Sequence, residues 1–520
     1  AIVFGTGDSG MMVYDTTLDN LFIWNGTAWT SVPDSGDSTN EQVIFNDNGV
    51  LVGDAGLLYN KTDQRLTVHG NIDIWHGNNP VNTSLAIGRD ALDLATTGGA
   101  NVALGRRAGN FLTTASNSVF VGYQAGYGGG TGTNVAVGAS ALFANTGSAN
   151  NVAVGANALL AATAGNNTAV GNSSLSGVTT GDYNTAIGAS SGSSITTGAV
   201  NIAFGVGALA GVGSVTGNYN IGIGSDALRS PSVISGSDNV GIGRDVLKGL
   251  SSGVDNVGIG RNSSNSTTTG TGNTAVGTNS GSLNLTASNV TAIGNAALYA
   301  NTAADNTAVG TQALTANTTG VGNTAVGRSA LVGNLTGSTN TGIGFQALNS
   351  STVDDLVAVG ANALLLNTTG LQNTAVGRSA LGASISGNNN TALGFNAGRS
   401  TVGSDHTAIG CNALGLATGG NQNVAVGSGA MGNGIVTGGF NTVIGTSAGY
   451  NLSSGTSNTF IGTDAGGIAT TGASNICIGR EATLAAVGSA NTLSIGSLNY
   501  FVATNGAAAT YYATATAGAI

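Results

Sequence analysis

A short block of alternating apolar and polar residues recurs along most of the chain. After residue 80, sequences of the form Asn-Thr-Ala-Val-Gly return repeatedly, and the closing glycine of each serves as an anchor. The 25 anchors run from Gly88 to Gly496, so 408 residues divide into 24 intervals of 16 to 19 residues with a mean of 17.0. A short and regular period is typical of repeat architectures in which each unit packs against its neighbours.

Each position of the repeat, counted from the anchor, has its own composition. Position −1 is always Val, Ile, Leu or Phe, −2 is usually small, −3 is mostly Val, Ile or Thr, and −4 is Asn in 19 of 25 copies. This alternation predicts a short strand with its β-branched residues on one face and the Asn and small residues on the other. Two variable residues follow the anchor, then commonly Ala-Leu, and then a loose Asn-Thr-Thr-Gly segment. We expect the Val/Ile and Leu columns to fill the interior.

The repeat length selects the fold class. Seventeen residues with helix-breaking glycines are too few for a helix pair and suit one coil of a β-solenoid. We therefore predict an all-β chain: a parallel β-solenoid of about 25 coils of about 17 residues, each with two short strands, a glycine corner and a polar turn. Coils stacked about 4.8 Å apart would place identical residues in columns, and stacked Asn amides can form a hydrogen-bonded ladder. The expected framework residues include Asn134, Asn151, Asn167, Asn184, Gly138, Gly155, Gly171, Gly188, Leu142 and Leu159.

Composition divides the chain into three segments. Residues 1–80 contain 10 of the 23 acidic and two of the 13 basic residues, which is −8 of the formal −10, together with all three tryptophans. Their patterns predict β-hairpins that would cap the first coil of the 81–496 solenoid. A glycan-binding head that uses Trp24 and Trp29 is the alternative.

The last segment, 497–520, is uncharged and predicts strands. Such a strand could fold back as a cap or pair with the next subunit, which makes it a candidate inter-subunit joint. The candidate assembly residues are Tyr511, Tyr512, Ala513 and Thr514. Non-identical, complementary ends would generate an open filament. The chain also begins at Ala1 without a methionine, as a processed secreted chain would.

Blocks such as Asn151-Val-Ala-Val-Gly-Ala-Asn-Ala-Leu159 resemble the head repeats of YadA-like trimeric autotransporter adhesins. They are also similar to repeats of bacteriophage tail fibres and environmental surface fibres. The resemblance covers about residues 80–496 and implies a left-handed β-roll, a trimer, and a place outside the cell, on its surface or on a virion appendage. Two features depart from the adhesins: the spacing is longer, and no coiled-coil stalk or β-barrel anchor pattern is present. The small-residue column would permit close approach of another chain, and a single-chain rod is the alternative.

The sequence offers little catalytic or ligand-binding chemistry. His69, His76 and His406 are too scattered for a zinc site or a catalytic triad, and His406 occupies the Asn column as an expected substitute in the ladder. We predict no enzymatic activity, no cofactor and no metal. Charged residues are only 7% and form no basic patch, so nucleic acid is not an expected partner. No apolar run approaches the ~20 residues that membrane insertion requires. Cys411 and Cys477 lie four coils apart, too far for a disulfide.

Fifteen Asn-x-Ser/Thr sequons occur, and chance in an Asn-, Ser- and Thr-rich chain accounts for many of them. Several fall in the predicted turns, where a glycan would fit. The candidate glycosylation sites are Asn25, Asn166, Asn172, Asn262, Asn317, Asn367 and Asn389.

Three functions are consistent with these patterns. We favour a structural subunit of an extracellular fibre or filament, in which a rigid solenoid rod assembles head-to-tail with copies of itself. The alternative is a receptor-binding trimeric adhesin or phage tail fibre that recognises cell-surface glycans. An ice- or polysaccharide-binding solenoid would need a flat threonine array, and it is disfavoured because the threonines are expected in the core-facing column and in the turns.

Overall fold

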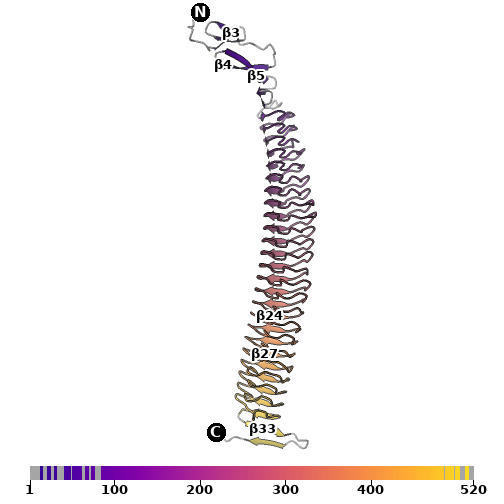
Figure 1. The fold of residues 1–520 in the computed structure, drawn as a ribbon, viewed down its shortest axis with the longest axis vertical. Helices are drawn as coiled ribbons and strands as arrows, with labels where there is room; N and C mark the ends of the chain where they lie inside the picture. The colour runs from indigo at the N-terminus through magenta and orange to yellow at the C-terminus, as the bar shows by residue number, and fades with distance from the viewer. Residues whose placement is uncertain are drawn as a thin grey trace. The chain divides into compact units, whose positions relative to one another are not determined.

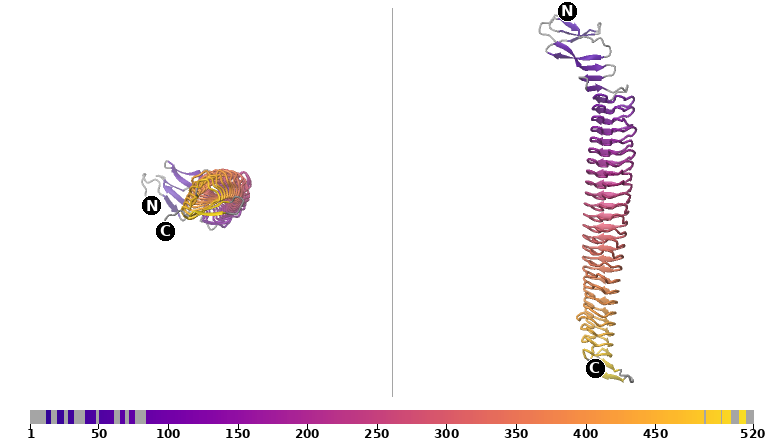
Figure 2. Two further views of the ribbon diagram at one scale, coloured as in Figure 1. Left: turned by 90° about the horizontal axis from the view of Figure 1, so that it is seen from below. Right: turned by 45° about the vertical axis from the view of Figure 1, so that its right-hand side comes forward.

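The computed structural model of the protein contains two compact units, residues 1–226 with 231–235 and residues 227–230 with 236–520. All regular secondary structure in the described residues is β-strand. The described residues are 12–15, 20–24, 28–31, 40–47, 50–60, 65–68, 72–75, 84–484, 486–496, 498–503 and 510–514. Within each unit the coils lie one above the next (Figures 1 and 2).

Antiparallel strands precede the solenoid in the first unit. A three-stranded sheet and a four-stranded meander follow the order of the chain. Their strands are β1 (Met12–Asp15), β2 (Asn20–Trp24), β3 (Trp29–Ser31), β4 (Asn40–Asp47), β5 (Val50–Asn60), β6 (Arg65–Val68) and β7 (Ile72–Trp75). The predicted hairpins correspond to β1–β2 and β5–β6. Strand β7 pairs antiparallel with β8 (Leu85–Ile87), with Ile74 opposite Ile87, so the meander occupies the open edge of the first coil.

The solenoid coils each contribute one short strand that ends directly before an anchor glycine. In the first unit these strands are β8, β9 (Val102–Leu104), β10 (Val119–Val121), β11 (Val135–Val137), β12 (Val152–Val154), β13 (Thr168–Val170), β14 (Thr185–Ile187), β15 (Ile202–Phe204) and β16 (Ile221–Ile223). In the second unit they are β17 (Val240–Ile242), β18 (Val257–Ile259), β19 (Thr274–Val276), β20 (Thr291–Ile293), β21 (Thr307–Val309), β22 (Thr324–Val326), β23 (Thr341–Ile343), β24 (Val357–Val359), β25 (Thr374–Val376), β26 (Thr391–Leu393), β27 (Thr407–Ile409), β28 (Val424–Val426), β29 (Thr442–Ile444), β30 (Thr459–Ile461), β31 (Ile476–Ile478) and β32 (Thr492–Ile495).

Successive solenoid strands within each unit are parallel and in register. Ala136, Ala153 and Ala169 lie opposite one another in β11, β12 and β13, and the same alignment holds along both units. Equivalent positions of the repeat therefore form continuous columns. This confirms the predicted parallel β-solenoid with a period of about 17 residues.

The column that fills the interior differs from the prediction. In β12 the middle residue, Ala153, is fully buried, whereas Val152 and Val154 on either side are partly exposed, and the other solenoid strands repeat this pattern. The buried interior consists of the small −2 residues, the Ala-Leu pairs and the Asn column. The prediction that Val/Ile columns fill the core was wrong, because the coil is narrow and Asn finds its amide partners inside. The small column is consequently enclosed within its own coil and cannot admit a second chain.

Each coil also has one strand where two were predicted. The Ala-Leu segment turns sharply, since Asn157 and Leu159 have positive φ angles of 57° and 50°. Such left-handed residues interrupt extended pairing. The segment is nevertheless bound to the next coil, because the Leu159 N–H donates to the Ser174 carbonyl at 2.9 Å.

The anchor glycines form the corner that ends each strand. Gly138, Gly155, Gly171 and Gly188 have φ angles between +130° and +135°. A Cβ atom on Gly155 would lie 2.4 Å from the carbonyl oxygen of Gly171 in the next coil. Glycine is needed here both for the backbone conformation and for the close approach of two coils.

One interior exchange shows how volume is conserved between columns. Phe120 replaces the usual alanine at −2 and is 1% exposed. The neighbouring leucine column is interrupted beside it by Gly109 and Gly126, and a Cβ atom on Gly126 would lie 2.2 Å from the Phe120 ring. Phe460 repeats this arrangement with Gly449 and Gly466. The aromatic ring therefore occupies the space that a leucine side chain would otherwise fill.

The chain folds back at the end of the second unit. Strand β33 (Leu498–Ala503) pairs antiparallel with β32, and β34 (Thr510–Thr514) pairs antiparallel with β33. The last coil is thus covered by the chain's own strands, which is the first of the two predicted arrangements for this segment.

Candidate functional site

The asparagine column forms an internal ladder of amide hydrogen bonds. The N–H of Asn458 donates to Oδ1 of Asn441 at 3.0 Å, and its Nδ2 donates to the Gly472 carbonyl of the following coil at 2.9 Å. The framework residues Asn134, Asn151, Asn167 and Asn184 occupy this column and are almost fully buried. For Asn167 and Asn184, the N–H donates at 2.9 Å to the Oδ1 of the preceding ladder Asn. Each side chain thus links its coil to the coils on both sides.

His406 continues this ladder in place of an asparagine. Its N–H donates to Oδ1 of Asn390 at 3.0 Å, and its Nδ1 accepts the N–H of Asn423 at 3.2 Å. Its Nε2 lies near the Gly420 carbonyl but makes no hydrogen bond of good geometry. Burial lowers the pKa of His406 below its ordinary value of 6.5, and the nearby Gly420 carbonyl and Asp405 carboxylate oppose that shift. The neutral imidazole of His406 therefore takes the place of an asparagine in the ladder. His69 and His76 lie outside the described residues.

A second, shorter amide ladder lies seven residues after the anchors. Nδ2 of Asn317 donates to Oδ1 of Asn301 at 2.7 Å, and Nδ2 of Asn334 donates to Oδ1 of Asn317 at 3.3 Å. Sequence reasoning missed this ladder because it treated the Asn-Thr-Thr-Gly segments as solvent-exposed turns. The signal was the constant spacing of Asn from a following glycine, since Asn317 also donates to the Gly320 carbonyl at 3.0 Å.

The second ladder separates the candidate glycosylation sites into two groups. Asn317 and Asn367 are fully buried, so neither has room for a glycan in the folded chain. The remaining described candidates are at least partly exposed, and they are Asn166, Asn172, Asn262 and Asn389. Asn25 lies outside the described residues.

The −3 and −1 columns, which we call the outer face, form one surface of the sheet. Position −1 is aliphatic in every strand from β17 to β32, and several members are substantially exposed, such as Ile343 at 38% and Leu393 at 48%. Position −3 is threonine in ten of the twelve strands from β19 to β30. No hydrogen bond within the described residues joins these threonine hydroxyls to the protein. The expectation that threonine faces the core was wrong for this column.

Charged residues border the outer face of the second unit on both sides. Because strands β17 to β32 all run in the same direction, position −5 forms one edge of the face and position +1 forms the other. The −5 edge contains exposed acids and no base, namely Asp238, Asp255, Asp305, Asp355 and Asp405. The +1 edge contains exposed bases and no acid, namely Arg244, Arg261, Arg328, Arg378 and Arg480. We call these the acidic edge and the basic edge.

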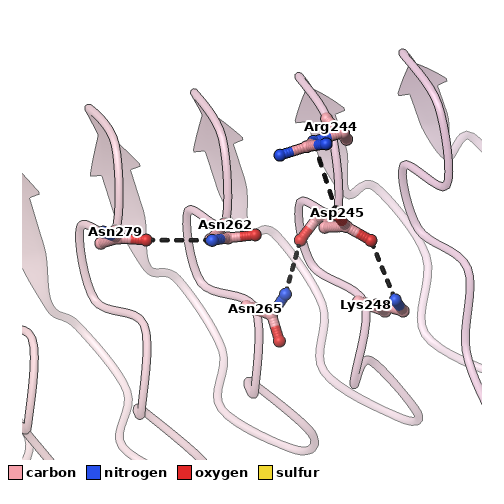
Figure 3. Close-up of polar contacts among 6 residues, drawn as sticks. All are labelled: Arg244, Asp245, Lys248, Asn262, Asn265 and Asn279. Atoms are coloured by element: carbon pink, nitrogen blue, oxygen red, sulfur yellow. Dashed lines mark hydrogen bonds and ion pairs between the residues drawn. The ribbon is translucent and has the colours of Figure 1, made fainter.

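One arginine of the basic edge, Arg244, is paired with an acid of its own coil. Figure 3 shows Arg244 beside Asp245, with Nε 3.8 Å from Oδ2, and Lys248 Nζ 2.9 Å from Oδ1 of the same aspartate. In the next coils, Asn262 donates to Oδ1 of Asn279 at 3.1 Å. Asp245, Asn262 and Asn279 all occupy position +2 of their coils, next to the basic edge at position +1.

Two other arginines lie over aromatic rings of the following coil. The guanidinium carbon of Arg328 is 4.5 Å from the Phe345 ring centre, and that of Arg378 is 5.9 Å from the Phe395 ring centre. A cation held over an aromatic face keeps its charge and a preferred orientation. Among the described residues, neither Arg328 nor Arg378 forms an ion pair.

The two cysteines differ in their surroundings. Cys411 is exposed on the basic edge, whereas Cys477 is buried at a −2 position. Burial raises the pKa of the Cys477 thiol to about 11. Both thiols are free, as the separation of their coils predicted.

Two kinds of site are not found in the part of the chain that the structure describes. No group of three or more His, Cys, Asp or Glu side chains there could hold a metal ion. No described helix is long and apolar enough to cross a membrane.

The candidate site is therefore an extended surface rather than a pocket: an aliphatic and threonine face between an acidic and a basic edge. Comparisons with protein-family models, curated proteins and solved structures find no match to this chain.

Proposed function

We propose that the protein is a structural subunit of an extracellular fibre or filament, in which the β-solenoid is a stiff spacer and the ends are joints. The observation that supports this most is the in-register stacking of coils through buried amide ladders in each unit. Within each unit, successive coils are bonded to one another, so each stretch of solenoid resists bending. A repeat of this kind builds a long, stiff element from one short sequence motif.

Head-to-tail joining would use the antiparallel strands at the two ends. Strand β33 occupies one edge of β34, so a following subunit would add to the opposite edge. The candidate assembly residues Tyr511, Tyr512, Ala513 and Thr514 all belong to β34. Addition of a strand to a sheet edge is a common mode of protein association.

Electron microscopy of the purified chain tests this proposal. We expect filaments much longer than one subunit from the full chain, and only single-subunit lengths from a variant that lacks residues 504–520. That deletion leaves β33 paired with β32 and so keeps the last coil covered. Equal filament lengths for both proteins would contradict joining through β34, and single subunits from the full chain would contradict the filament.

A receptor-binding adhesin or tail fibre is the second candidate. The pairing of β2 with β3 places Trp24 opposite Trp29, so two tryptophans are adjacent in the first unit. Adjacent aromatic residues suit binding of the apolar faces of sugars. Binding to a glycan array that is lost in the Trp24→Ala, Trp29→Ala double variant would support this function over a purely structural one.

The outward threonines also favour a third candidate, an ice-binding face. Threonine hydroxyls would repeat every ~4.8 Å along the −3 column, and methyl groups would repeat both along the sheet and ~6.6 Å across it, in the −3 and −1 columns. Thermal hysteresis of the purified protein tests this candidate, and its absence would exclude it.

A further inference from the structure

The outer face of the second unit is a long surface without charge. The 15 spacings of ~4.8 Å between its sixteen strands extend about 72 Å, and a strip about 10 Å wide gives an area on the order of 700 Å². Its −3 and −1 columns contain only Val, Ile, Leu and Thr from β17 to β32. The aliphatic −1 column alone makes up about half of that strip, on the order of 350 Å², which is comparable to the largest apolar patch on a typical monomer (about 300–600 Å²), and patches of that size are often functional.

A partner for this face must match its period over that length. Another copy of the same solenoid has the same strand spacing, so aliphatic side chains of one sheet can fit between those of the other at every coil. We propose that copies of this chain associate side by side through the outer face, with their coils stacked in the same direction. This extends the proposed self-assembly from the ends of the solenoid to its sides, and it rests on that proposed function.

The charged edges determine the direction of association. When two sheets face each other with the same stacking direction, the acidic edge of one lies along the basic edge of the other. When one copy is inverted about an axis along the strands, acidic meets acidic and basic meets basic. Opposite potentials favour association and like charges oppose it, so the edges select the parallel arrangement.

The positions of individual charges also indicate how two copies align along the stacking axis: equivalent coils lie at about the same height. Asp238 and Asp255 belong to the same coils as Arg244 and Arg261 on the opposite edge.

A second pair of charges shows nearly the same alignment. Asp305 precedes β21, one coil before the coil of Arg328, and Asp355 precedes β24, one coil before the coil of Arg378. Four of the five acids therefore have an arginine within one coil, about 4.8 Å along the axis, when copies are aligned. Asp405 has no such partner, and Arg480 lies 3.0 Å from Glu481.

Sedimentation equilibrium measures this association in the full chain. We expect oligomers for the natural chain and a dissociation constant raised about tenfold or more by Ile343→Lys, which places a charge in the outer face. Leu335→Lys is the matched control, since Leu335 is 49% exposed in the segment between β22 and β23 and lies off the face. Equal association of both variants would overturn the proposed surface.

Charge reversal then tests direction. The double variant Arg328→Glu, Arg378→Glu should weaken association about tenfold, and adding Asp305→Arg and Asp355→Arg should restore it. In an inverted arrangement each edge meets the same edge of the other copy, so glutamate would replace arginine on both sides of the contact, and the double variant should associate no more weakly than the natural chain. Association that the arginine reversal does not weaken would therefore overturn the parallel arrangement.

Lateral and end-to-end association are distinguishable by particle length. Side-by-side association multiplies mass at constant length in electron micrographs, whereas head-to-tail joining increases length. A monomer in sedimentation at micromolar concentration overturns the lateral proposal, and a monomer with thermal hysteresis would indicate ice as the occupant of the face. Filaments that keep single-chain mass per length would overturn lateral association and leave the proposed end-to-end function intact.

Discussion

The Phe120 exchange provides a quantitative test of how the solenoid interior is filled. Phe120→Ala removes a ring that is 1% exposed, and truncation of a buried phenylalanine typically costs about 3–5 kcal/mol. Gly126→Leu alone would bring its side chain into the space that the Phe120 ring occupies, because even a Cβ atom would lie 2.2 Å from that ring. Overpacking of this kind typically costs about 1–3 kcal/mol. Together the two changes recreate the Ala and Leu combination of other coils, such as Ala136 with Leu142, whose φ is 54°.

We therefore expect the double variant to be more stable than Phe120→Ala alone, with a coupling energy of about 1–3 kcal/mol. Amide hydrogen exchange of peptides that span residues 102–137 gives the local opening free energy directly, which suits a repeat protein that need not unfold in one step. Tyr183→Ala is the control, since this side chain is 59% exposed and its loss should change protection little. Additive effects of the two substitutions would refute the idea that one ring replaces a leucine.

Three further predictions concern single residues. Gly155→Ala should destabilise the solenoid by about 2–6 kcal/mol through backbone strain and overpacking, whereas Gly147→Ala, where a Cβ atom meets nothing within 4 Å, should be nearly neutral in denaturant unfolding. Because burial keeps His406 neutral when folded, the unfolded chain binds the extra proton, and stability should fall below pH 6.5 at up to about 1.4 kcal/mol per pH unit. His406→Asn should remove that slope, and an unchanged slope would assign it to other groups. A thiol reagent should modify Cys411 rapidly and Cys477 only on unfolding, and two rapidly reacting thiols would contradict the buried position of Cys477.

The periodic part of the fold was predictable because the same physical constraint repeats at every coil. A glycine corner in the anchor column leaves a regular signal in the sequence, as Gly155 shows, so the parallel solenoid and its period were correct. The direction in which each column points was not predictable from alternation alone. Alternation assigns residues to two faces but does not say which face is inside, and hydrophobicity favoured Val152 and Val154 over Ala153 and Asn151. In the structure Ala153 and Asn151 are inside instead, because the coil is narrow and the Asn amides are hydrogen-bonded there.

The candidate surface depended on that reversal. While the Val/Ile/Thr columns were expected in the core, the −5 acids and the +1 arginines had no common surface to border. The second amide ladder was hidden for a related reason, since Asn317 and Asn334 stand in polar segments that are typical of exposed turns. Only the coil geometry shows that these side chains turn inward.

The most direct test of the proposed structural role is cryo-electron microscopy of the assembled protein at side-chain resolution. The account predicts filaments in which each subunit contributes coils about 4.8 Å apart, with Ala153 and Asn151 inside each coil and Val152 and Val154 on the outer face. Isolated subunits, or coils with the valines inside and the asparagines facing solvent, would contradict it.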